Sequence, residues 1–116
     1  MSNAQYEQLD IDQGVDFVAH FYVERKDGSD PNLQTATARA SLKKNTRQDS
    51  ADATFLTGIN FENDYVSISL TNEQTSALTK KTYVYDVFLD YVDSDGDVTS
   101  LKLVWGDVDV MPAVTR

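Results

Sequence analysis

Residues 15–23 read Val-Asp-Phe-Val-Ala-His-Phe-Tyr-Val, and this stretch indicates the fold more directly than any other part of the chain. Every second position carries an apolar side chain: Val15, Phe17, Ala19, Phe21 and Val23. The positions between them include Asp16 and His20, and Glu24 follows. A period of two residues is typical of a β-strand with one face on a core and the other in solvent. The sequence therefore predicts a half-buried strand here.

The same period recurs along the chain. Strand-like segments lie at residues 35–43, 53–61, 65–70, 82–92 and 98–105, with Val108 and Val110 continuing the last one and Leu9 and Ile11 forming a short strand near the start. In the segment 35–43 small side chains alternate inward: Ala36, Ala38, Ala40 and then Leu42. Alanine favours helices, but the strict alternation predicts a strand. Leu101, Leu103 and Trp105 are expected to share one face, with Gly106 kinking or bulging the ladder.

Turn and cap signals separate these segments. Lys26–Pro31 combines glycine and proline, Glu62–Asp64 fits a tight hairpin connection, and residues 45–52 form a polar loop. Thr71–Gln74 matches a capping box, in which threonine and glutamine side chains satisfy free amides at a helix start. We expect one helical turn here, with Leu78 docked on the edge of the sandwich.

Seven or eight short strands with one helical turn predict an all-β fold, a single antiparallel β-sandwich of immunoglobulin-like type, with a barrel as the second choice. A chain of 116 residues has the usual size of one domain. We place this domain at residues 6–116 and expect residues 1–5 to be disordered or derived from an expression tag.

Composition narrows the function classes. The chain has no cysteine, which excludes disulfides and thiolate metal sites. Nineteen acidic and ten basic residues give a formal charge of −9, and such a surface repels nucleic-acid phosphates. No apolar run approaches the roughly 20 residues of a membrane span. We therefore expect neither nucleic acid nor membrane as a partner, and no cofactor.

Two groups of polar residues are candidates for catalysis, and each has a better structural interpretation. His20, the one histidine, falls on the polar side of its strand and has no sequence signature of a base beside a nucleophile, so an exposed strand residue is the better interpretation. Asp107 with Asp109, and Asp10 with Asp12, resemble the paired carboxylates of glycosidases. On an alternating strand, however, acids two residues apart are what a solvated face produces. No catalytic residue is predicted, and the chain is expected not to be an enzyme.

One turn and one aromatic group have alternative interpretations. Asp93, Asp95 and Asp97 flank Gly96 and resemble half of a calcium loop, but the ligand spacing and a closing glutamate are missing, so an Asp-Gly hairpin turn is favoured over a weak cation site. Tyr83, Tyr85 and Tyr91 with Trp105 fill the core or its rim on the first interpretation. If exposed, the three tyrosines form a candidate interface with a protein or sugar. The segment 82–92, apolar at both phases, fits a strand covered on both sides or one at a subunit contact.

Several phrases of the sequence also resemble a known group of proteins. They include Tyr6–Gly14, Ala38–Lys43, Val66–Leu78, Tyr83–Val87 and Gly106–Val110. In this order they are similar to the small β-sandwich structural proteins of tailed bacteriophages, including sandwich modules of baseplates and tail fibres. The resemblance covers about Tyr6 to Arg116 and rests on fold motifs.

The resemblance implies a non-enzymatic virion structural or assembly protein, a tail, baseplate or head–neck component, made in the host cytoplasm. It implies protein–protein contacts with other virion proteins and with further copies of the chain. Tyr83–Asp97 is more polar and aromatic than the pattern of that group. The alternative is a carbohydrate- or receptor-binding adhesin module that uses exposed aromatics and the acidic turn.

Overall fold

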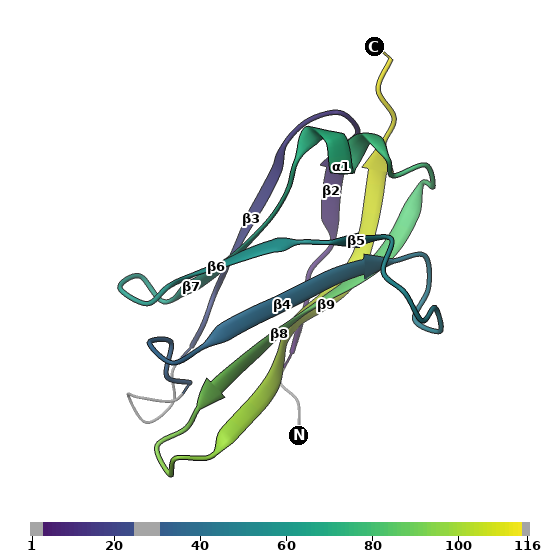
Figure 1. The fold of residues 1–116 in the computed structure, drawn as a ribbon. Coiled ribbons are helices and arrows are strands. Elements are labelled where there is room, and N and C mark those ends of the chain that lie inside the picture. Colours follow the sequence, from purple (N-terminus) through teal and green to yellow (C-terminus); the bar gives the residue numbers. More distant parts are fainter. Residues whose placement is uncertain (1–3, 25–30, 115–116) are drawn as a thin grey trace.

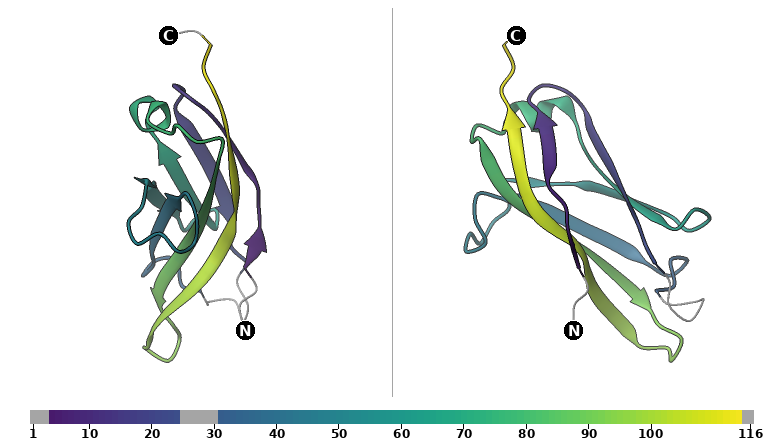
Figure 2. Two further views of the ribbon diagram at one scale, coloured as in Figure 1. Left: turned by 90° about the vertical axis from the view of Figure 1, so that its right-hand side faces the viewer. Right: turned by 180° about the vertical axis from the view of Figure 1, so that it is seen from behind.

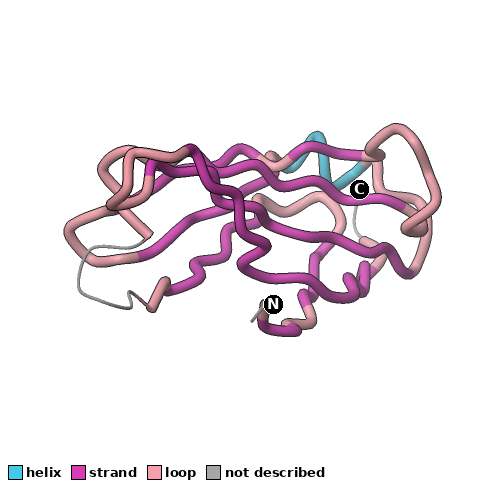
Figure 3. The backbone as a smooth tube through the Cα atoms, turned by 90° about the horizontal axis from the view of Figure 1, so that it is seen from below, coloured by secondary structure: helices cyan, strands magenta, loops and turns pink. Residues whose placement is uncertain are grey.

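The computed structural model describes residues 4–24 and 31–114. Within these ranges the chain forms strands and one short helix in the order β1 (Gln5–Tyr6), β2 (Leu9–Asp12), β3 (Phe17–Tyr22), β4 (Thr37–Lys43), β5 (Ala53–Thr54), β6 (Leu56–Asn60), β7 (Tyr65–Leu70), α1 (Asn72–Ser76), β8 (Thr82–Val92) and β9 (Val98–Met111). The strands make two packed sheets with α1 at one end (Figures 1 and 3). The prediction of an all-β sandwich is confirmed.

The larger sheet has the strand order β1-β9-β8-β4-β5, with β2 also paired to β9, and the smaller sheet has the order β3-β7-β6. The prediction of a purely antiparallel sandwich is wrong at one edge, because β1 and β2 run parallel to β9. Leu9 and Ile11 align with Val108 and Val110, so all four turn into the core. The alternation fixes which face is buried but not the direction of pairing.

The predicted strand 53–61 is divided between the two sheets. Residues of β5 pair with β4 in the larger sheet, whereas those of β6 pair with β7 in the smaller one. Phe55 lies at the break, and its buried ring packs about 6.3 Å from the rings of Phe17 and Tyr85. The chain crosses between sheets where burial of this ring in the core compensates for the interrupted ladder.

β9 runs through the length of the molecule, from the hairpin at one end to the C-terminal segment at the other (Figure 2). A register shift lies between Val87 and Phe88, which face Val104 and Lys102, so Leu103 is the extra residue of a bulge. The bulge changes which face each residue occupies. Leu101 and Leu103 pack on the core while Trp105 is exposed, so their predicted common face is wrong, and the irregularity does not lie at Gly106.

The core forms between the two sheets from the predicted alternating residues. Ala40, Leu42 and Val23 are buried, and Phe17, Ala19 and Phe21 pack against the core cluster. Val15, predicted to join this face, is exposed. Gly14 has φ +86 and reverses the chain before β3, so the strand begins only at Phe17.

The capping box is confirmed. The Thr71 side chain accepts a hydrogen bond from the Gln74 amide, and Gln74 Oε1 accepts one from the Thr71 amide. Leu78 is buried as expected. The hairpin at Glu62–Asp64 is closed with Asp64 at φ 57.

Two predictions fall partly outside the described residues. The turn at Lys26–Pro31 does so through residues 26–30, and the N-terminal segment 1–5 does so through residues 1–3. Gln5, which was predicted to belong to the disordered segment, lies in β1 and pairs with Val104 of β9. The prediction is therefore wrong for this residue.

Candidate functional site

His20 lies on the outward face of β3, exposed as predicted. Its ring stacks on Tyr65 with 4.4 Å between centroids and 18° between planes. Across the described ranges, no group of three or more His, Cys, Asp or Glu could hold a metal ion. The residues aligned with His20 across the sheet are Ser67 and Gly58, so the described strands place a hydroxyl and an aromatic ring beside this histidine.

The turn at Asp93–Asp97 closes the β8–β9 hairpin, with Gly96 at φ +85. One Asp93 carboxylate oxygen accepts hydrogen bonds from the Asp95 and Asp97 amides, each at 2.9 Å, and the other accepts one from Thr99 Oγ1. These bonds hold the pKa of Asp93 below its usual range. The carboxylate organises the turn, in the geometry of the favoured hairpin interpretation.

The paired carboxylates lie together on the outer face of the larger sheet. Asp10 aligns with Asp109 through the parallel pairing of β2 and β9. The Tyr6 hydroxyl donates to Asp107 at 2.6 Å, and Gln8 Nε2 donates to Asp109 at 2.7 Å. The bond to Asp107 raises the pKa of Tyr6. The arrangement is a solvated, hydrogen-bonded acidic surface.

The candidate interface of Tyr83, Tyr85 and Tyr91 is not exposed. These residues retain 3%, 4% and 9% of their accessible surface, because the odd positions of β8 face the core. Burial raises the pKa of Tyr85, whose hydroxyl donates to the Glu7 carbonyl at 2.8 Å. Within this chain they are core residues, as the first interpretation predicts, and the alternative of an exposed patch is wrong.

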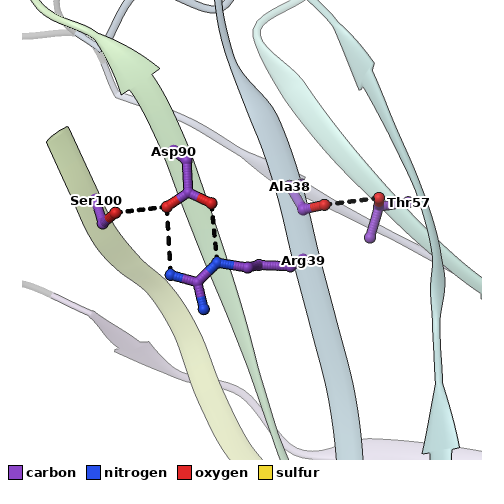
Figure 4. A network of polar contacts seen from close by, with 5 residues as sticks. All are labelled: Ala38, Arg39, Thr57, Asp90 and Ser100. Atoms are coloured by element: carbon purple, nitrogen blue, oxygen red, sulfur yellow. Dashed lines mark hydrogen bonds and ion pairs between the residues drawn. The ribbon is translucent and has the colours of Figure 1, made fainter. Parts of the chain in front are cut away.

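On the opposite face of β8, the Phe88 ring lies beneath two cationic side chains. The Arg39 guanidinium lies 4.6 Å from the centroid of Phe88, and the Lys102 ammonium lies 5.6 Å from it on the neighbouring strand. Arg39 also forms two hydrogen bonds with Asp90, which accepts a third from Ser100 (Figure 4). These cations cover the Phe88 ring, whereas Val92 on the same face of β8 remains exposed.

One surface was missed by sequence reasoning. The outer face of the three-stranded sheet carries exposed Val18 and Tyr22 together with Tyr65 and Leu56. The signal was present, because two of the three outward positions of β3 are apolar or aromatic.

A second feature is an unpaired strand edge. From Val98 to Lys102, β9 pairs with β8 on one side, and no other described strand pairs with it on the other. The Asp93 amide donates to the Asp97 carbonyl, so the alternation of an antiparallel ladder turns the backbone groups of Val98, Ser100 and Lys102 away from β8. We call this segment the open edge.

Comparison with known protein families and with curated proteins found no matching family and no matching protein. No helix within the described ranges is long and apolar enough to cross a membrane.

Proposed function

We propose that the chain is a non-enzymatic structural subunit of a tailed-bacteriophage virion, in the tail, baseplate or head–neck region, and that it binds neighbouring subunits. The sequence resemblance supports the bacteriophage origin. The immunoglobulin-like strand arrangement and the location in the virion, after synthesis in the host cytoplasm, belong to this proposal, and the two packed sheets are compatible with it.

The open edge is the observation that carries the protein-contact part. The hairpin of β8 and β9 extends past the rest of the sandwich (Figure 1), in a molecule with principal extents of 51 × 30 × 20 Å. Its outward backbone groups are available to a strand from another subunit, and Val98 beside them is 80% exposed. Strand addition uses these groups for affinity and alternate side chains for specificity. An unprotected edge of this kind is usually shielded when it has no partner.

Mass spectrometry and cross-linking of purified phage particles test the proposal. We expect the chain in the particles, with cross-links from Lys102 to another virion protein or to a second copy. A chain that is missing from the particles and remains monomeric by light scattering would contradict it.

A matched pair of variants tests the open edge itself. Val98→Pro removes an outward N–H without removing a bond to β8, whereas Val98→Thr keeps that N–H. Both are expected to fold, as circular dichroism would show, and only Val98→Pro should lose incorporation into particles. Equal incorporation of the two variants would argue against strand addition at this edge.

An adhesin role is the second candidate. The tyrosines first considered for it, Tyr83 and Tyr85, are buried, so carbohydrate binding requires other aromatic residues. The exposed aromatics of the three-stranded sheet are the observation that keeps this candidate.

A further inference from the structure

Among the described residues, the outward positions of β3, β7 and β6 carry no Asp, Glu, Lys or Arg. Strand register arranges its nine outward positions in three rows across β3, β7 and β6: Val18–Ser69–Leu56, His20–Ser67–Gly58 and Tyr22–Tyr65–Asn60. We call these residues the neutral face. The chain has 29 charged residues in 116, and the larger sheet displays Arg39, Asp90 and Lys102 on its own outer face. A face of this kind, without charged side chains in a highly charged protein, indicates contact with an uncharged ligand.

The aromatic rings of the neutral face form one continuous group. Tyr65 lies between His20, stacked at 4.4 Å, and Tyr22, edge-on at 5.6 Å. The Tyr65 hydroxyl accepts a hydrogen bond from Asn60 Nδ2, which holds that ring in place. Tyr22 is 70% exposed, and Leu56 and Val18 at the other end are 75% and 62% exposed. Exposed apolar and aromatic residues at both ends of one sheet face make that face a candidate binding surface.

The middle row supplies a serine hydroxyl and an imidazole ring. Gly58 has no side chain, and a Cβ there would lie 2.9 Å from Ser67 Oγ, so the serine hydroxyl occupies the centre of the face. The His20 ring lies beside it on β3, and Ser69 lies in the next row. The side-chain layer is therefore thinnest where neutral hydrogen-bonding groups are placed, with rings and aliphatic groups on either side.

We propose that the neutral face binds an uncharged oligosaccharide. A sugar ring has an apolar C–H face that packs on an aromatic ring, and hydroxyls that pair with serine, imidazole and amide groups. A polyanion would approach against the net charge of −9. A cationic ligand would find no carboxylate in these three rows.

The size of the face favours a sugar chain over a second copy of the protein. Three strands about 4.8 Å apart, each about 20 Å long, give a face of roughly 300 Å². A standard protein interface takes about 20–30 residues from each partner. The nine positions of the neutral face are fewer than that, and the face matches an oligosaccharide of a few rings. This inference rests on the adhesin candidate above, whose ligand class and site it names, and not on the proposed virion role.

Titration of the full chain with uncharged hexasaccharides tests the inference. The probes are cellohexaose, mannohexaose and chitohexaose, followed through backbone amide NMR shifts. We expect at least one to bind, with shifts confined to residues 18–22, 56–60 and 65–69. Absence of binding to all three, or shifts centred on another surface, would overturn the inference.

Three variants assign the site. Tyr22→Ala should weaken binding by about tenfold, Tyr22→Phe should retain most of it, and Trp105→Ala, an exposed aromatic of the other sheet, should leave it unchanged. Tyr22 is exposed, so its replacement should not prevent folding. Equal losses in Tyr22→Ala and Trp105→Ala would overturn the assignment. So would a concentration-dependent dimer abolished by Tyr22→Ala, because the face would then be a contact between copies.

Discussion

The backbone of Glu7 passes directly over Gly106, and this approach fixes the N-terminal strand on β9. A Cβ at position 106 would lie 2.1 Å from the Glu7 carbonyl oxygen and 3.3 Å from the Tyr85 ring. That carbonyl accepts the Tyr85 hydroxyl, and the Glu7 amide donates to the Trp105 carbonyl. Only glycine accommodates this contact without displacing the backbone.

Gly106→Ala should therefore destabilise the protein by about 1–3 kcal/mol, the usual cost of forcing extra volume into a packed site. Urea unfolding would measure the change, and faster hydrogen exchange at the Glu7 amide would locate it. Val98→Ala, an exposed change on the same strand, is the control and should stay within about 0.5 kcal/mol. A Gly106→Ala protein as stable as this control would show that β1 shifts at no cost.

At the scale of single residues, sequence patterns predicted burial well within regular strands. The inward alternation of Ala40 and Leu42 and the outward position of His20 are as expected. The prediction that Trp105 faces the core is wrong because a one-residue bulge in β9 reverses which residues face inward. The alternation of apolar and polar residues gives no sign of such a bulge. The exposure of Tyr22 was not predicted, because aromatic residues are common in strands whether their side chains face the core or the solvent.

Among the elements, α1 is secured by a buried hydroxyl. Thr75 is fully buried, and its Oγ1 accepts from the Gly14 amide at 3.0 Å and lies 3.0 Å from the Val15 carbonyl, to which it donates. One side chain thus ties the helix to the turn between β2 and β3.

Thr75→Val keeps the volume but leaves these backbone groups without their partner. We expect a loss of about 1–3 kcal/mol in unfolding free energy, the penalty for unsatisfied buried polar groups. Loss of hydrogen-exchange protection at the Gly14 amide would accompany it. The exposed Thr79→Val is the matched control. If both variants lose equally little, a water molecule replaces the hydroxyl.

The Arg39–Asp90 pair joins β4 to β8 and makes their contribution depend on pH. Hydrogen bonds from Arg39 and Ser100 and the nearby positive charge lower the pKa of Asp90. A carboxylate whose pKa is lower in the folded state stabilises the protein above its unfolded pKa, about 3.9, and this stabilisation is lost as pH falls through the folded value.

Asp90→Asn should cost about 0.5–1 kcal/mol at pH 7, since Arg39 is exposed and Asp90 is only partly buried. The difference from the unmodified protein should shrink as pH falls below about 4. Urea unfolding at pH 7, 4 and 3 would measure it, with Asp49→Asn, exposed in the loop before β5, as the control. A difference independent of pH would mean that the pair acts by packing over Phe88 and not by charge.

Pairing between elements was less predictable than the elements themselves. The segments 65–70 and 82–92 and the cap at Thr71 match the structure closely, because each depends on local periodicity or local hydrogen bonds. The division at Phe55 and the parallel pairing of β2 depend on which sheet edge is free in space. The residues around β2 and Phe55 do not indicate which sheet edge is free, because that edge is formed by strands distant in the sequence.

At the scale of the whole molecule, the charges are unevenly placed. Asp10, Asp12, Asp107 and Asp109 lie on neighbouring strands of the larger sheet, within a chain of net charge −9. The outer face of the smaller sheet is neutral. Among the described residues the structure shows ion pairs at Arg39–Asp90 and Lys44–Asp52, so repulsion between carboxylates outweighs attraction.

Raising sodium chloride from 10 to 150 mM should therefore stabilise the fold, because the screening length falls from about 30 to about 8 Å. Urea unfolding at each salt concentration is the measurement, since urea adds no ions. The double variant Asp10→Asn with Asp12→Asn removes two exposed charges from the acidic outer face of the larger sheet. It should raise the free energy of unfolding at low salt and reduce the change in that free energy with salt. A fall in stability with salt would mean that the two ion pairs contribute more than the acidic surface costs. The uneven distribution of charge between the two sheets would then not affect stability. It would matter only for which ligands bind to each sheet.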